Sequence, residues 1–111
     1  MSLSTHVLDT AAGRPARGVA VVCERASTEG WQRLAERVTD ADGRIGDLVP
    51  AGELATGVHR LTFATGEWAA TNGMTIFWPH VTVAFDVTDA GEHHHVPLLL
   101  SPYGYSTYRG S

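Results

Sequence analysis

The sequence contains no lysine, and all eight of its basic side chains are arginine. This absence excludes Schiff-base catalysis, a lysine general base and the lysine of a phosphate-binding loop. The single cysteine, Cys23, excludes a disulfide within the chain and a cysteine-rich zinc module. A chain with so little cysteine suits a reducing compartment, and we therefore expect a cytoplasmic protein. We also expect Cys23 to be buried in a strand.

Long apolar runs and a surplus of positive charge are also missing. No stretch approaches the roughly 20 apolar residues of a membrane-spanning helix, and the first residues lack the charged and apolar regions of a signal peptide. Acidic side chains outnumber basic ones by 12 to 8, which gives a net charge of −4. We therefore expect neither a membrane nor a nucleic acid as partner.

The chain has enough apolar material for one compact core. Its 111 residues are 43% hydrophobic, and a chain of this length buries roughly two thirds of its unfolded surface. We expect a single domain over residues 1–111, with no internal repeat or linker. A domain this small has little depth for a catalytic pocket of its own.

The hydrophobic pattern is mostly that of β-strands. Short apolar or alternating segments predict strands at 3–8, 18–24, 31–39, 58–64, 81–87, 95–101 and 103–108. Segment 31–39 also fits a short helix, but its neighbours favour a strand. Residues 67–72, followed by Gly73, predict a short helix with a glycine stop. Seven or eight short strands at regular spacing predict an all-β sandwich.

Two isolated polar residues in this pattern are candidates for a site. His6 shares a strand face with Leu8, opposite Val7, and a half-exposed histidine on a strand is the ordinary interpretation. Arg44 is the last residue of a predicted turn, 40–44, in which Gly43 is free to take a positive φ. A turn arginine is usually solvated, but its guanidinium could also bind a carboxylate or a urea-like ligand. His59 and His80 are expected to face solvent or to hydrogen-bond locally.

Three consecutive histidines form the only biased run. In a strand, His93 and His95 face one way and His94 the other. A pair spaced i and i+2 could share a metal ion, but no acidic or thiol ligand stands at short spacing, and we expect no metal and no other cofactor. Residues 97 and 99 share the face of His95, whereas Val96, Leu98 and Leu100 are predicted core residues.

The end of the chain is unusually rich in tyrosine and hydroxyl side chains. Its pattern predicts a strand that ends in ordered polar groups, Tyr108, Arg109 and Ser111. Histidine can take a proton from water and return it, and arginine can stabilise developing negative charge. Such groups suit hydrolysis of a planar, nitrogen-rich carbonyl compound, although spacing alone does not bring them together.

Four segments are recognisable as a set: S-T-H-V-L-D-T-A-A-G-R-P-A near the start, the A-D-G-R turn, F-W-P-H-V-T-V-A-F, and the closing H-V-P-L-L-L-S-P-Y-G-Y-S-T-Y-R-G-S. Together they strongly resemble the 5-hydroxyisourate hydrolases, the transthyretin-like enzymes of urate breakdown. The resemblance runs from Leu3 to Ser111, and the final tetrapeptide Y-R-G-S is the family's signature.

The resemblance implies a two-sheet sandwich of about eight strands with one short helix. It implies a homotetramer, a dimer of dimers with a central channel, that hydrolyses 5-hydroxyisourate to 2-oxo-4-hydroxy-4-carboxy-5-ureidoimidazoline without a cofactor. The active sites would lie at the dimer–dimer interface. The residues carried over are His6, Arg44 and His95 as catalytic groups, and Tyr108, Arg109, Gly110, Ser111, Pro97 and Leu99 as groups lining the substrate site.

The resemblance also frames the main alternative, a transthyretin-type carrier with an aromatic ligand in the channel. The carrier lacks the closing tetrapeptide and the paired histidines, so their presence here favours the enzyme. One residue departs from the pattern: His94 stands where the hydrolases commonly have tyrosine. Because it is predicted to point away from His95, we expect little effect on catalysis.

Overall fold

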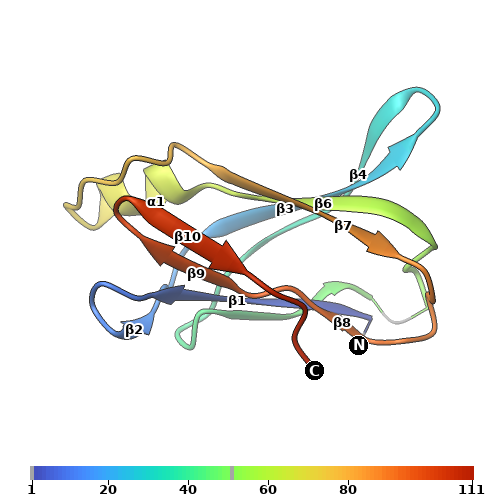
Figure 1. The fold of residues 1–111 in the computed structure, drawn as a ribbon, viewed down its shortest axis with the longest axis horizontal. Coiled ribbons are helices and arrows are strands. Elements are labelled where there is room, and N and C mark those ends of the chain that lie inside the picture. Colours follow the sequence, from blue (N-terminus) through green and yellow to red (C-terminus); the bar gives the residue numbers. More distant parts are fainter. Residues whose placement is uncertain (1, 51) are drawn as a thin grey trace.

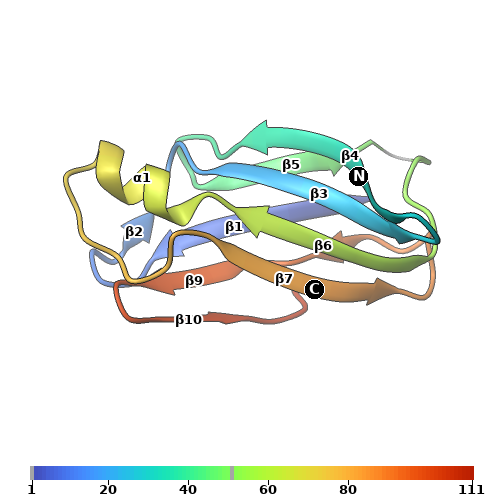
Figure 2. The same ribbon diagram turned by 90° about the horizontal axis from the view of Figure 1, so that it is seen from above.

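The computed structural model describes residues 2–50 and 52–111, which form two β-sheets packed face to face with one short helix at one end (Figures 1 and 2). The first sheet is antiparallel throughout and has the strand order β4-β3-β6-β7. Its strands are β3 (Ala20–Ser27), β4 (Gly30–Val38), β6 (Gly57–Phe63) and β7 (Val81–Val87). All four were predicted from the hydrophobic pattern.

The second sheet has six strands, arranged around β1. Its strands are β1 (Leu3–Asp9), β2 (Arg14–Pro15), β5 (Arg44–Val49), β8 (His94–His95), β9 (Leu98–Ser101) and β10 (Gly104–Thr107). Strand β1 pairs antiparallel with β2 and β5, and parallel with β8 and β9. The order β10-β9-β1-β2 leaves β10 at an edge. The predicted all-β sandwich with one helix is confirmed.

Two features of this sheet differ from the sequence-based expectation. The predicted strand over 95–101 is divided into β8 and β9 at Val96 and Pro97, because proline has no N–H to donate to a β-ladder. Strands β2 and β5 were not predicted. Arg44 was placed in a turn, but it is the first residue of β5.

The helix α1 (Thr65–Thr71) begins two residues earlier than expected, and Gly73 ends it with a φ of 67°. The Gly73 N–H donates to the Ala70 carbonyl and the Met74 N–H to the Ala69 carbonyl, the pattern of a Schellman cap. Seven residues long, α1 is the only helix among the described residues, none of which forms a helix able to cross a membrane.

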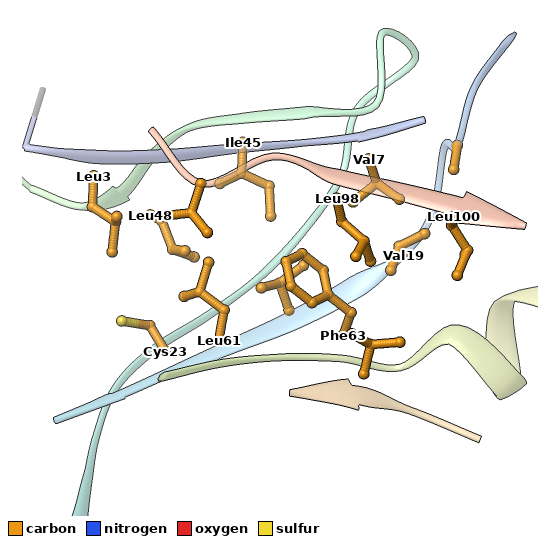
Figure 3. Packing of buried hydrophobic residues seen from close by; sticks show 14 of the residues in the cluster. Leu3, Val7, Val19, Cys23, Ile45, Leu48, Leu61, Phe63, Leu98 and Leu100 are labelled. Atoms are coloured by element: carbon orange, nitrogen blue, oxygen red, sulfur yellow. The ribbon is translucent and has the colours of Figure 1, made fainter. Parts of the chain in front are cut away.

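The core fills the space between the two sheets (Figure 3). Alternate residues of β3, β6 and β9 point inward, and the predicted core residues Val96, Leu98 and Leu100 are all buried. Cys23 is fully buried as expected, and burial raises its pKa to about 12, which keeps the thiol protonated. His59 makes the expected local hydrogen bond, from Nδ1 to the Gly57 carbonyl at 2.9 Å, but it is completely buried.

Candidate active site

The outer face of the six-stranded sheet brings His6 and Arg44 together. They are cross-strand partners in the antiparallel pair of β1 and β5, and paired residues present their side chains on the same face. The His6 Nε2 lies 2.8 Å from the Asp42 carbonyl oxygen. Because a carbonyl only accepts hydrogen bonds, Nε2 carries the proton, and the Nδ1 of a neutral His6 keeps its lone pair.

The turn before Arg44 is held by Asp40 and Gly43. The Asp40 Oδ1 accepts hydrogen bonds from the backbone N–H groups of Asp42 at 2.9 Å and Arg44 at 3.0 Å. The hydrogen bond from Arg44 is the main reason that the pKa of Asp40 lies below its usual value. Gly43 takes the predicted positive φ, 73°, and its carbonyl accepts a hydrogen bond from the Val7 N–H at 2.7 Å. The turn therefore seats the start of β5 on β1.

The histidine run, residues 93–95, pairs through β8 with β1 along the edge opposite β5. The N–H groups of His94 and Val96 donate to the carbonyls of Ser2 and Ser4 at 2.9 Å and 3.0 Å. His95 is the parallel partner of Ser4, and its Nδ1 lies 2.8 Å from the Ser4 Oγ. The His93 Nε2 lies 2.9 Å from the same oxygen, so His93 and His95 share a face as predicted.

The surroundings of His95 favour its neutral form. Burial is the largest cause that lowers its pKa from the ordinary 6.5, followed by the nearby Arg44 guanidinium and then by the closeness of His6 and His93. A hydrogen bond with the Ser4 backbone acts in the opposite direction. At neutral pH, His95 is therefore a neutral imidazole that can accept a proton.

These side chains line a hollow of about 320 Å³. Its lining residues are Ser4, Thr5, Arg44, Ile45, Gly46, His93, His95 and Ser111. Of the predicted catalytic residues, Arg44 and His95 face it directly. His6 lies beside it, close enough for its charge to act on His95. Of the final tetrapeptide, Ser111 lines this hollow and the other three residues do not.

The other predicted site residues lie elsewhere. Tyr108 and Arg109 line a second hollow of about 220 Å³ together with the buried His94 and with Phe85. Arg109 also pairs with Glu92 at 2.9 Å on the surface. His94 thus points away from His95, as predicted.

Gly110, Pro97 and Leu99 border neither hollow. The Gly110 N–H donates to the His95 carbonyl at 2.8 Å, and a Cβ on Gly110 would overlap the His95 ring. Pro97 is buried and Leu99 is half-buried on the chain taken alone.

Five lining residues were not predicted for the site, and two of them, Ser4 and His93, hydrogen-bond within it. Ser4 carried no signal in the sequence beyond its place before His6, and His93 was considered only as half of a metal pair. Among residues 2–50 and 52–111, no group of three or more histidine, cysteine, aspartate or glutamate side chains stands together as a metal site.

Comparison with known proteins shows the family of the chain. Residues 3–110 match the HIUase/Transthyretin family. The chain belongs to this family. The 5-hydroxyisourate hydrolase of Caulobacter vibrioides is 50% identical over 113 residues, which cover 98% of this chain and 97% of the relative.

Solved structures similar to this chain include a 5-hydroxyisourate hydrolase and a transthyretin bound to thyroxine. The Klebsiella pneumoniae 5-hydroxyisourate hydrolase superposes with a TM-score of 0.87 at 40% identity, covering 100% of both chains. Sea bream transthyretin in complex with thyroxine superposes with a TM-score of 0.92 at 33% identity, covering 99% of this chain and 95% of that one. The hydrolase and the transthyretin share this fold, so the fold alone does not assign a function to this chain. The side chains that the fold carries must do so.

Proposed function

We propose that the protein is a hydrolase that opens the ring of 5-hydroxyisourate and yields 2-oxo-4-hydroxy-4-carboxy-5-ureidoimidazoline, a step of urate degradation. The observation that carries this proposal is the convergence of Arg44 and His95 on one hollow, with His6 beside it. The curated relatives named as hydrolases of this compound, at up to 50% identity, support the same substrate.

In the proposed reaction, His95 removes a proton from water as the water oxygen attacks a ring carbonyl. Arg44 stabilises the negative charge that develops on the carbonyl oxygen. The C–N bond of the ring then breaks and the nitrogen receives the proton from His95, which leaves a ureido group and a carboxylic acid. The acid releases its remaining proton to solvent and becomes a carboxylate. His6, with its Nδ1 lone pair, orients the attacking water.

The remaining residues take substrate-binding roles in this proposal. Ser111 hydrogen-bonds the substrate from the rim of the hollow. Gly110 lets the chain end approach His95, while Tyr108 and Arg109 shape the substrate site from a neighbouring subunit. Pro97 and Leu99 line the channel between subunits. No cofactor takes part, and the protein works in the cytoplasm without a nucleic-acid or membrane partner.

Such a division of roles requires the proposed homotetramer, a dimer of dimers. Strand β7 ends one sheet and β10 ends the other, so the described chain has an edge strand in each layer that could pair with a second copy. Phe77 and Tyr105 are 66% and 44% exposed and both pack against Trp78, so they form an exposed aromatic patch that a second copy could cover. Light scattering should give a mass four times the 11.9 kDa of one chain, and a monomer at assay concentration would refute the shared site.

The test of the activity is direct. 5-Hydroxyisourate is generated from urate with urate oxidase, and its absorbance decay is followed with and without the protein. The decay should accelerate with the wild-type protein and return close to the spontaneous rate with His95→Asn. If the wild-type protein leaves the spontaneous rate unchanged, the hydrolase proposal is wrong.

A transthyretin-type carrier is the second candidate, favoured by the similarity to the thyroxine-bound sea bream structure. A carrier has no use for a neutral histidine next to an arginine in its channel. Titration with thyroxine distinguishes the two functions: saturable binding together with no acceleration of hydroxyisourate decay would indicate the carrier.

A further inference from the structure

The Ser4 hydroxyl makes hydrogen bonds to two histidines. Its Oγ lies 2.9 Å from the His93 Nε2 and 2.8 Å from the His95 Nδ1. Ser4 lines the hollow and is only 7% exposed. The three side chains form a continuous hydrogen-bonded row that runs from the half-buried His95 to the exposed His93.

The hydroxyl makes the two hydrogen bonds depend on each other. A serine hydroxyl has one hydrogen to donate, so it must donate to one histidine while it accepts from the other. In the first arrangement, the His95 Nδ1–H donates to Ser4, and Ser4 donates to the His93 Nε2. The His95 Nε2 then has a lone pair and can act as a base. In the reverse arrangement, the His95 Nε2 carries a hydrogen and can act only as a donor.

The Ser4 backbone favours the first arrangement. It raises the pKa of His95 and so favours a proton on the ring. A proton on Nδ1 lies on the side of the ring that faces Ser4, where the hydroxyl oxygen at 2.8 Å can accept it. The resting site therefore presents the His95 Nε2 as a base.

We propose that Ser4 and His93 are positioning residues that form a proton relay with His95. This inference rests on the proposed hydrolysis. When the His95 Nε2 takes a proton from water, the Nδ1 proton moves to the Ser4 Oγ and the Ser4 hydrogen moves to the His93 Nε2. His95 is left neutral with a hydrogen on Nε2, ready for the leaving nitrogen, and the positive charge rests on His93. The reverse shift restores the resting arrangement.

Electrostatics gives this shift a direction. A positive charge on His95 would be half-buried and would face Arg44 and His6. His93 is exposed on the chain taken alone, so water solvates the same charge better there than at the half-buried His95. The relay therefore lowers the energy of the state in which the site has taken up the proton of water.

The first experiment does not depend on activity. Nitrogen NMR of protein labelled with ¹⁵N-histidine reports which ring nitrogen of His95 carries the proton. At a pH where His93 is neutral, we expect the proton on Nδ1 in the wild-type protein and a mixture of both tautomers in Ser4→Ala. The relay is refuted if wild-type His95 is protonated on Nε2, or if Ser4→Ala leaves its tautomer unchanged.

The second experiment measures turnover of 5-hydroxyisourate. Ser4→Ala should lower kcat about 10- to 100-fold with little change in KM, and Ser4→Thr, which keeps the hydroxyl, should recover most of the loss. Ser2→Ala is the matched control, because Ser2 lies just before the same strand, is also 7% exposed and donates its hydroxyl to the Pro50 carbonyl, away from the histidines. Thermal unfolding of each variant checks that it folds.

A double-mutant cycle tests whether the residues act as one unit. His93→Gln should cost about as much kcat as Ser4→Ala, and the double variant should be no slower than either single one. Losses that multiply would overturn the relay. If the wild-type protein does not hydrolyse the compound, the proposed function fails, whereas the NMR experiment still decides whether Ser4 sets the state of His95.

Discussion

Gly110 lies directly against the imidazole ring of His95, and its N–H donates to the His95 carbonyl at 2.8 Å. The end of the chain and the proposed base are thus fixed to each other by a contact that only glycine permits. A Cβ at position 110 would have to occupy the place of the ring. This contact gives the signature tetrapeptide a steric role in addition to any role in binding substrate.

The substitution Gly110→Ala should therefore displace His95 without unfolding the protein. Since a misplacement of about 1 Å in an active site can cost roughly 100-fold in rate, we expect a loss of this order in kcat. The thermal midpoint should change little, because the chain end is mostly exposed. Ser106→Ala, on the exposed strand β10, is the control; full activity in Gly110→Ala would contradict the steric role.

Removal of the Arg44 charge should change both the rate and its pH dependence. We expect Arg44→Gln to lower kcat about 100- to 1,000-fold, because the oxyanion loses its charged donor. In the wild-type protein the rate should fall on the acid side with a midpoint below pH 6.5, since His95 must be neutral to act as a base. A nearby positive charge lowers the pKa of a histidine, so the variant's midpoint should move to higher pH.

The acid midpoint is measured from kcat between pH 5 and 8 and from NMR titration of His95. Arg33→Gln, which removes an exposed arginine paired with Glu36, should leave both quantities unchanged. A midpoint that does not move in Arg44→Gln would show that Arg44 is not the charge that acts on His95.

A substitution at Gly43 should affect both the stability of the fold and the activity of the site. Its φ of 73° is strained for any residue with a Cβ, and a Cβ there would strike the Val7 carbonyl. Gly43→Ala should therefore lower the free energy of unfolding by about 1–3 kcal/mol and reduce activity, because β5 begins at the next residue. Denaturant unfolding measures this, with Gly13→Ala as a control that has a similar φ of 70° but open space around it. Equal losses of unfolding free energy in Gly43→Ala and Gly13→Ala would show that backbone strain alone acts, and that the overlap with the Val7 carbonyl adds nothing.

His59 makes the fold sensitive to acid. It is completely buried, and its Nε2 has no hydrogen-bond partner within the described residues. Burial is the main cause that lowers its pKa below the ordinary 6.5. The unfolded chain therefore binds the proton more readily, so the stabilisation is complete above pH 6.5 and is lost as the pH falls toward the lower folded-state pKa.

Replacement of His59 should remove this part of the acid sensitivity. In His59→Phe, the new ring can stack on Phe85 as the imidazole does, and the free energy of unfolding should decline less between pH 6.5 and pH 5 than in the wild-type protein. Unfolding by urea at several pH values measures the slope. The exposed variant His80→Gln should behave like the wild type, and an unchanged slope in His59→Phe would assign the acid sensitivity to other groups.

The sequence by itself determined the strand alternation and what depends on it. Because side chains in a strand alternate between two faces, the core positions Val96, Leu98 and Leu100 and the shared face of His93 and His95 followed from local pattern. Composition also excluded lysine chemistry, so the proposed site depends on histidine and arginine.

Only the tertiary structure decided which of these groups meet. His6 faces Arg44 across 38 positions of sequence because β1 and β5 pair, and β5 left no clear alternation from which it could be predicted. Ser4 joins His93 and His95 because β8 lies parallel to β1, a pairing between the two ends of the chain. Strand pairing is a long-range choice set by the packing of whole sheets, so no local pattern could place one hydroxyl between two imidazoles.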